Sequence, residues 1–240
     1  MYPISPQLAA FVARTESFTS DDSSLQGLRQ NYDRMCQAFT PPQPQDLQVS
    51  DYSLAGVGVR SYLPKAPAPA EGWPCLLYMH GGGWVVGGLD SHDFICFELA
   101  SALQVLVIAI EYRLAPEHPF PAAYEDCRAV WQAIQAEEGP HGINLQRLVV
   151  VGDSAGGNLA AALCLGLRDD GQPLPLAQVL IYPGLGGATD LPSRVIARTR
   201  LCSAPPTPTA TWRSTCWVPA IRRPMPCHCW PRISAVCPRH

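Results

Sequence analysis

One heptapeptide, Gly152–Asn158 (Gly-Asp-Ser-Ala-Gly-Gly-Asn), constrains the fold of this chain more than any other feature. The apolar run 148–151 precedes it, and the helix-favouring run 159–163 follows it. A Gly-x-Ser-x-Gly segment between a strand-like run and a helix-like run is typical of a nucleophile elbow, a very sharp strand-to-helix turn. Side chains beside the serine would clash in such a turn, so glycines are needed there. The segment therefore predicts an α/β fold with Ser154 at the turn.

A second glycine-rich motif, His80–Trp84 (His-Gly-Gly-Gly-Trp), follows the apolar run 76–79. Backbone N–H groups from such a loop, and from Ala155 after the serine, can converge on an oxyanion. Taken singly, each motif is equally compatible with a structural role: Ser154 as a helix N-cap, and the glycine loop as an ordinary turn. Both motifs in this order, each after a strand-like run, favour the catalytic interpretation.

Three blocks of the sequence, 76–88, 105–127 and 148–166, resemble the hormone-sensitive-lipase-like branch of the α/β-hydrolases. The most specific string is Glu111–Ala123 (Glu-Tyr-Arg-Leu-Ala-Pro-Glu-His-Pro-Phe-Pro-Ala-Ala). The resemblance extends over roughly residues 45 to 192. It implies a serine hydrolase that cleaves short-chain carboxylic esters through an acyl-enzyme, with no metal and no organic cofactor.

The resemblance also implies roles for individual residues. Ser154 would be the nucleophile, and the N–H groups of Gly82, Gly83 and Ala155 would form the oxyanion hole. Gly81 would allow the turn, and His80 would shape the loop rather than act as the base.

Six neighbouring side chains are not assigned to the catalytic machinery. His92 and His118 are interpreted as structural, and Asp153 as too close to the serine to orient a distant histidine. Arg113, Glu117 and Asp126 are expected to form a buried polar network above the sheet.

Apolar periodicity predicts alternating strands and helices. Helices are expected within 1–40, interrupted at 21–24, and at 94–102, 121–138 and 155–167; strands are expected at 48–54, 57–62, 75–79, 105–110, 148–151 and 178–182. This alternation predicts a mostly parallel sheet with helices on both faces. Residues 1–45 are expected to form N-terminal cap helices, and residues 46–192 the α/β-hydrolase core, truncated at its C-terminal end.

Composition changes abruptly near residue 191. Residues 1–190 contain all 20 acidic residues and 9 of the 17 basic ones, whereas 191–240 contain eight arginines, nine prolines, five cysteines and no acid or glycine. Three interpretations of the tail, 193–240, are a basic arm for an acidic partner, a cysteine-based metal or disulfide module, and a shifted reading frame of GC-rich DNA. The third is favoured, because the change coincides with the end of the resemblance and involves no linker.

The catalytic triad implied by the resemblance needs an acid and then a histidine after Ser154. No aspartate or glutamate follows Asp190, and His228 and His240 have no predicted strand to carry them. Cys227, His228 and Cys229 are too tightly spaced for one tetrahedral zinc, so no metal site is expected. The 240-residue chain is therefore expected to be inactive.

A net charge of −3 argues against a nucleic-acid partner. The chain does not open with the basic stretch and apolar core of a signal peptide, and no apolar run is long enough to span a membrane. The cysteines before residue 191 are expected to be buried free thiols. A cytoplasmic enzyme with a small-molecule ester substrate is expected, and its oligomeric state is open. Two alternatives to an active enzyme remain: a catalytically dead protein of this fold that binds a ligand, and a non-functional fragment.

Overall fold

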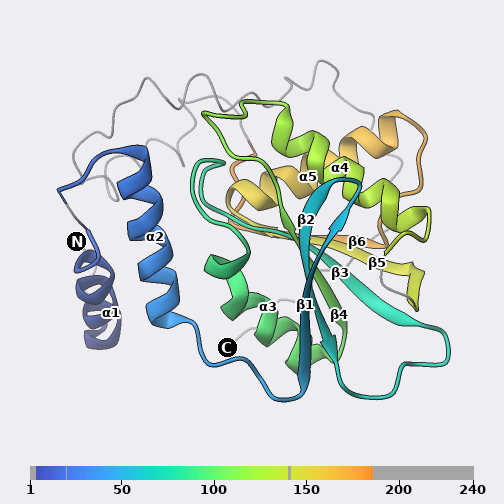
Figure 1. Cartoon of the computed structure of the whole chain (residues 1–240), viewed down its shortest axis with the longest axis horizontal. Helices are drawn as coiled ribbons and strands as arrows, with labels where there is room; N and C mark the ends of the chain where they lie inside the picture. Colours follow the sequence, from blue (N-terminus) through green and yellow to red (C-terminus); the bar gives the residue numbers. More distant parts are fainter. Residues whose placement is uncertain (1–3, 20, 140–141, 186–240) are drawn as a thin grey trace.

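The computed structural model describes residues 4–19, 21–139 and 142–185 (Figure 1). Its centre is a six-stranded sheet in the order β1-β2-β4-β3-β5-β6. Strands β1 and β2 form an antiparallel hairpin, and β2 pairs antiparallel with β4; strands β4, β3, β5 and β6 are parallel to one another. The strands are β1 (Leu47–Leu54), β2 (Val57–Pro64), β3 (Trp73–Met79), β4 (Leu106–Glu111), β5 (Ile143–Asp153) and β6 (Ala177–Ile181). The predicted, mostly parallel sheet is confirmed.

Helices cover both faces of this sheet, as predicted (Figure 1). They are α1 (Pro6–Glu16), α2 (Leu25–Phe39), α3 (Leu89–Leu103), α4 (Ala122–Gln135) and α5 (Ala155–Asp169). One core contains Trp131 of α4 and Leu163 of α5, and the other contains Cys96 and Phe97 of α3. The central strands β3 and β4 supply buried side chains to both cores, as expected for strands of a parallel sheet covered on two sides.

Two elements begin five residues earlier than the sequence pattern predicts. Strand β5 begins at Ile143, because that residue pairs with Trp73 of β3 beyond a register shift. Helix α3 begins at Leu89 rather than Phe94. Its first turn carries Asp90, and Asp93 follows directly; both form ion pairs with Arg60 of β2. Both extensions depend on partners that are distant in the sequence.

The N-terminal helices form a pair beside α3 (Figure 1). Ser24 caps α2 by accepting a hydrogen bond from the Gly27 N–H, at the break that the sequence indicates. Helix α1 buries no residue and meets α2 through the rings of Phe11 and Phe39, 5.1 Å apart. The tail expected at 193–240 lies outside the described residues.

The described cysteines are free thiols, four of them buried (Cys36, Cys75, Cys96 and Cys127) and Cys164 partly buried. The buried four agree with the prediction and pack as small apolar groups. Among the helices of the described segments, none is long and apolar enough to cross a bilayer.

Candidate active site

Ser154 occupies the sharp turn between β5 and α5. Its backbone has φ 50° and ψ −111°, a conformation that non-glycine residues seldom adopt. The Ser154 N–H donates to the Ile181 carbonyl at 2.8 Å, which ties the turn to β6. The Ser154 side chain makes no capping hydrogen bond to α5, so the helix-cap alternative does not describe it. The hydroxyl is held at the N-terminus of α5, where the helix dipole is positive.

Close backbone packing joins this turn to the loop after β3. Met79 and Gly152 are paired in the parallel register of β3 and β5. A Cβ atom built on Gly156 would collide with the backbone carbonyls of Met79 and His80. Only glycine lets α5 approach β3 this closely, so the two glycine motifs lie side by side.

We expect Gly156→Ala to destabilise the protein by about 3 kcal/mol, because the obstacle is backbone and cannot rotate away. Gly58→Ala is the matched control, since its Cβ would meet only the Glu111 side chain, at 3.4 Å. Thermal unfolding measures the effect: the expected loss in melting temperature is about 6–12 °C for Gly156→Ala. Equal melting temperatures for the two variants would contradict the tight approach.

The loop at 80–88 has an unusual run of backbone angles. Gly82, Gly83 and Trp84 all have positive φ, at 119°, 62° and 62°. The N–H groups of Val85 and Val86 both donate to the Gly82 carbonyl, at 3.1 and 3.0 Å. Within the described part of the chain, neither Gly82 nor Gly83 donates its own N–H to another group. Two adjacent donors are thus left available on a loop whose turn is held by the Gly82 carbonyl.

His80 is buried against Tyr112, with ring centroids 4.1 Å apart. Its Nδ1 lies 2.7 Å from the Gly81 carbonyl, which only accepts hydrogen bonds, so the proton is on Nδ1. Nε2 has no partner in the described structure. Burial, together with the nearby His92, lowers the pKa of His80 to about 3. His80 is thus a neutral ring that bonds to its own loop, and the loop-shaping role stays a prediction.

This depressed pKa predicts acid sensitivity. In the unfolded chain His80 takes up a proton below about pH 6.5, whereas in the folded chain it does so only near its lowered value. The contribution of His80 to the free energy of unfolding is therefore fully present above pH 6.5. Each pH unit below 6.5 should lower the free energy of unfolding by up to about 1.4 kcal/mol. Urea unfolding between pH 4.5 and 8 measures this slope. His80→Asn keeps a donor near Nδ1 and should flatten the slope; an unchanged slope would exclude His80 as its source.

Asp153 connects the elbow to the loop and to α3. Its carboxylate is buried and accepts hydrogen bonds from the Tyr78 hydroxyl at 2.7 Å and the Gly81 N–H at 2.9 Å. His92 Nε2 lies 3.6 Å from Asp153 Oδ1. Burial opposes ionisation of Asp153, but the contacts from His92, Tyr78 and Gly81 outweigh it and lower its pKa. Asp153 thus contacts a histidine that is distant in the sequence, because α3 brings His92 to it; that Asp153 does not orient the base of Ser154 stays a prediction.

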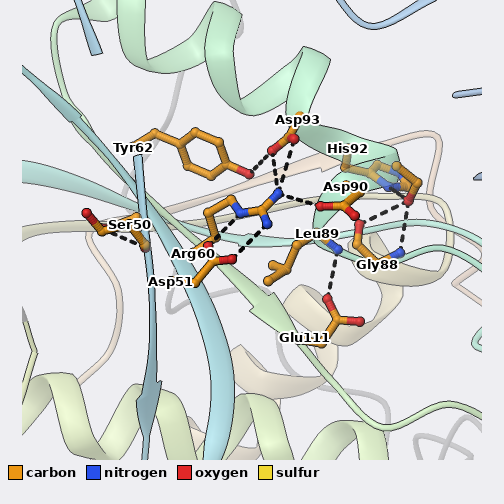
Figure 2. Close-up of polar contacts among 12 residues, drawn as sticks. Ser50, Asp51, Arg60, Tyr62, Gly88, Leu89, Asp90, His92, Asp93 and Glu111 are labelled. Atoms are coloured by element: carbon orange, nitrogen blue, oxygen red, sulfur yellow. Dashed lines mark hydrogen bonds and ion pairs between the residues drawn. The ribbon is translucent and has the colours of Figure 1, made fainter. Parts of the chain in front are cut away.

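Figure 2 shows what holds the first turn of α3 in place. Arg60 of β2 donates to Asp90 of this turn, to Asp93 directly after it and to Asp51 of β1. The Tyr62 hydroxyl also donates to Asp93, at 2.6 Å. The same turn carries His92, whose Nδ1 lies 2.8 Å from the Ser91 hydroxyl. The charged cluster on the antiparallel hairpin therefore fixes the helix that delivers His92 to Asp153.

The polar network expected around Arg113 is only partly buried. Arg113 binds buried Asp126 through Nε and Nη2, at 2.7–3.0 Å. Glu117, expected in the same network, is half-exposed and binds Arg29 of α2 instead. A contact with a helix almost ninety residues away leaves no local signal in the sequence.

Some predicted site residues are not brought together. His118 is exposed, and His228 and His240 lie outside the described residues. No histidine occurs between Ser154 and residue 185, the last residue described. Among the described side chains, no group of three histidine, cysteine or carboxylate residues is placed to hold a metal ion.

Comparison with known proteins shows which family and which proteins this chain resembles. A family model described as the alpha/beta hydrolase fold matches residues 76–229. Esterase LipI of Mycobacterium tuberculosis is 39% identical over 179 residues (72% of this chain, 55% of the relative). The ethyl acetate hydrolase of Pseudomonas putida is 44% identical over 151 residues (60% and 48%). The chain thus spans about half the length of the curated relatives it matches.

A solved structure gives the same result for the fold. The crystal structure of an esterase from the bacterial hormone-sensitive lipase family superposes with a TM-score of 0.67 at 31% identity. The match covers 77% of this chain and 59% of that one.

Proposed function

Because this chain belongs to the alpha/beta hydrolase fold family, on its hormone-sensitive-lipase-like branch of esterases, we propose that the protein hydrolyses carboxylic esters with Ser154 as nucleophile. The observation that carries the proposal is the junction of the two glycine motifs. The Gly81 N–H bonds to Asp153, and Gly156 packs on the backbone of Met79 and His80. Ser154 is thereby fixed beside a loop that has two unused N–H donors.

The proposed chemistry proceeds in two steps. The Ser154 oxygen attacks the ester carbonyl carbon, a base takes the hydroxyl proton, and the carbonyl π electrons move onto the oxygen. The N–H groups of Gly82, Gly83 and Ala155 bind this oxyanion, and the positive end of α5 adds to the stabilisation. Collapse expels the alcohol, which takes the proton, and leaves an acyl-enzyme. Water then gives a proton to the base and attacks the acyl carbon; cleavage of the bond to the Ser154 oxygen releases the carboxylic acid, and the proton returns to Ser154.

Short-chain acyl esters are the proposed substrates, consistent with relatives such as the ethyl acetate hydrolase. Reaction needs no metal or organic cofactor in this proposal. The four buried free cysteines of the described segments fit a reducing compartment, and a cytoplasmic location is part of the proposal. Residues 193–240 are proposed to come from a shifted reading frame. The chain translated in the restored frame, called here the frame-restored chain, would supply the triad acid and histidine.

An organophosphonate with a p-nitrophenol leaving group tests this proposal. It should label the frame-restored chain once, on the peptide containing Ser154, and should abolish hydrolysis of p-nitrophenyl butyrate in proportion to labelling. Binding of a short-chain ester without labelling or turnover would instead support the ligand-binding alternative. Labelling at a different serine would contradict the assignment of Ser154.

A further inference from the structure

Helix α2 presents one face to the candidate active site. Arg29, Tyr32 and Cys36 are three and four residues apart, so they share this face. Cys36 is buried, and the Tyr32 ring lies 6.3 Å from that of His92. Burial, and to a lesser extent Cys36 and Asp153, raise the pKa of Tyr32. The inner face of α2 therefore lies next to His92, which contacts Asp153 of the elbow.

Arg29 attaches this face to both loops that border the site. Its Nε donates to the Val85 carbonyl at 2.8 Å, and its Nη2 donates to the Ala115 carbonyl at 3.1 Å. The Glu117 carboxylate accepts hydrogen bonds from Nη1 and Nη2 of Arg29, at 2.8 and 2.7 Å. One guanidinium thus binds three groups on two loops.

The two loops are also bonded to each other next to these contacts. The Ala115 N–H donates to the Trp84 carbonyl at 2.8 Å, and the Val85 N–H donates to the Gly82 carbonyl. Arg29 therefore links Val85 and Ala115, whose loops are also joined by the bond from Ala115 to Trp84. Val85 is in turn bonded to Gly82, the first proposed oxyanion donor. Movement of α2 away from the core would release this link.

The backbone contacts matter more than the ion pair. Glu117 is 49% exposed, and an ion pair in contact with water contributes little to stability. The Arg29 side chain is 28% exposed, and its planar fork satisfies several acceptors at fixed angles. Lysine would keep the charge but offers one ammonium group, which cannot span Val85, Ala115 and Glu117 together.

From this arrangement we infer that Arg29 is a positioning residue, through which cap helix α2 holds the 82–86 loop in the geometry that binds the oxyanion. The inference rests on the proposed esterase function for its catalytic consequence. Its structural part, the dependence of the loop on α2, stands without that function.

Hydrogen exchange and kinetics of three variants test the inference: Arg29→Met, Arg29→Lys and, as matched control on the same helix, Arg34→Met. Arg34 is exposed and binds only Asn31 on its own helix, as far as the described contacts show. We expect amide exchange at 82–86 to rise about tenfold in both Arg29 variants, with no change at 74–79 of β3. In the frame-restored chain, kcat for p-nitrophenyl butyrate should fall about tenfold with KM unchanged.

The outcomes separate this inference from the proposed function. Turnover that does not depend on Ser154 would refute the proposed function, and the exchange measurement would then decide the inference alone. Exchange at 82–86 equal in Arg29→Met and Arg34→Met would overturn the inference, as would an equal rise at 74–79, which indicates general loosening. Full restoration by Arg29→Lys would also overturn it, because charge without the forked geometry would then suffice. Exchange is measured on both the frame-restored and the 240-residue chain.

Discussion

In the frame-restored chain, Ser154→Ala is expected to lower the turnover of a short-chain ester by at least about ten-thousandfold. The alanine removes the hydroxyl oxygen that forms the covalent bond to the acyl group in the proposed mechanism. The oxyanion donors alone support only a small residual rate. The fold should persist, because the Ser154 side chain makes no capping hydrogen bond that the substitution would remove. Initial rates with p-nitrophenyl butyrate measure the loss.

Ser53→Ala is the matched control for this substitution. Ser53 is exposed on β1, at the opposite edge of the sheet from β6, and should retain full turnover. Melting temperatures of the two variants should agree within a few degrees. Unchanged turnover in Ser154→Ala would show that a different group performs the attack.

The 240-residue chain is expected to turn over at least about a thousandfold more slowly than the frame-restored chain. Its sequence has no acid after Asp190 to orient a histidine, so Ser154 would have no organised base. Stability should be reduced as well. Within the described residues β6 pairs with β5 alone, and Val179 and Tyr182 on and after this strand are exposed. An uncovered apolar strand edge favours aggregation.

Solubility, thermal unfolding and ester turnover of the two chains, measured side by side, test this expectation. The coding DNA around codons 190–200 provides an independent check of the shifted frame. A soluble, cooperatively unfolding 240-residue protein with comparable turnover would overturn the proposal. It would also mean that His228 or His240 reaches Ser154.

Local patterns in the sequence are sufficient for the elbow and the layers of the fold. The turn at Ser154 follows from residues that are adjacent in the chain, since glycine spacing and the change from strand to helix periodicity are local properties. The alternation of strands and helices likewise predicts a parallel sheet covered on both faces, and the Ser24 cap of α2 is visible as a break in apolar spacing.

Tertiary structure alone decides which side chains meet around that elbow. The early start of α3 depends on Arg60 from β2, and the contact between His92 and Asp153 depends on where α3 then lies. Arg29 binds Glu117 across 88 positions, and no periodicity in the chain marks either residue as a partner of the other. Side-chain hydrogen bonds between distant segments carry no local sequence signal, because they depend on packing that forms only when the whole sheet and its helices assemble.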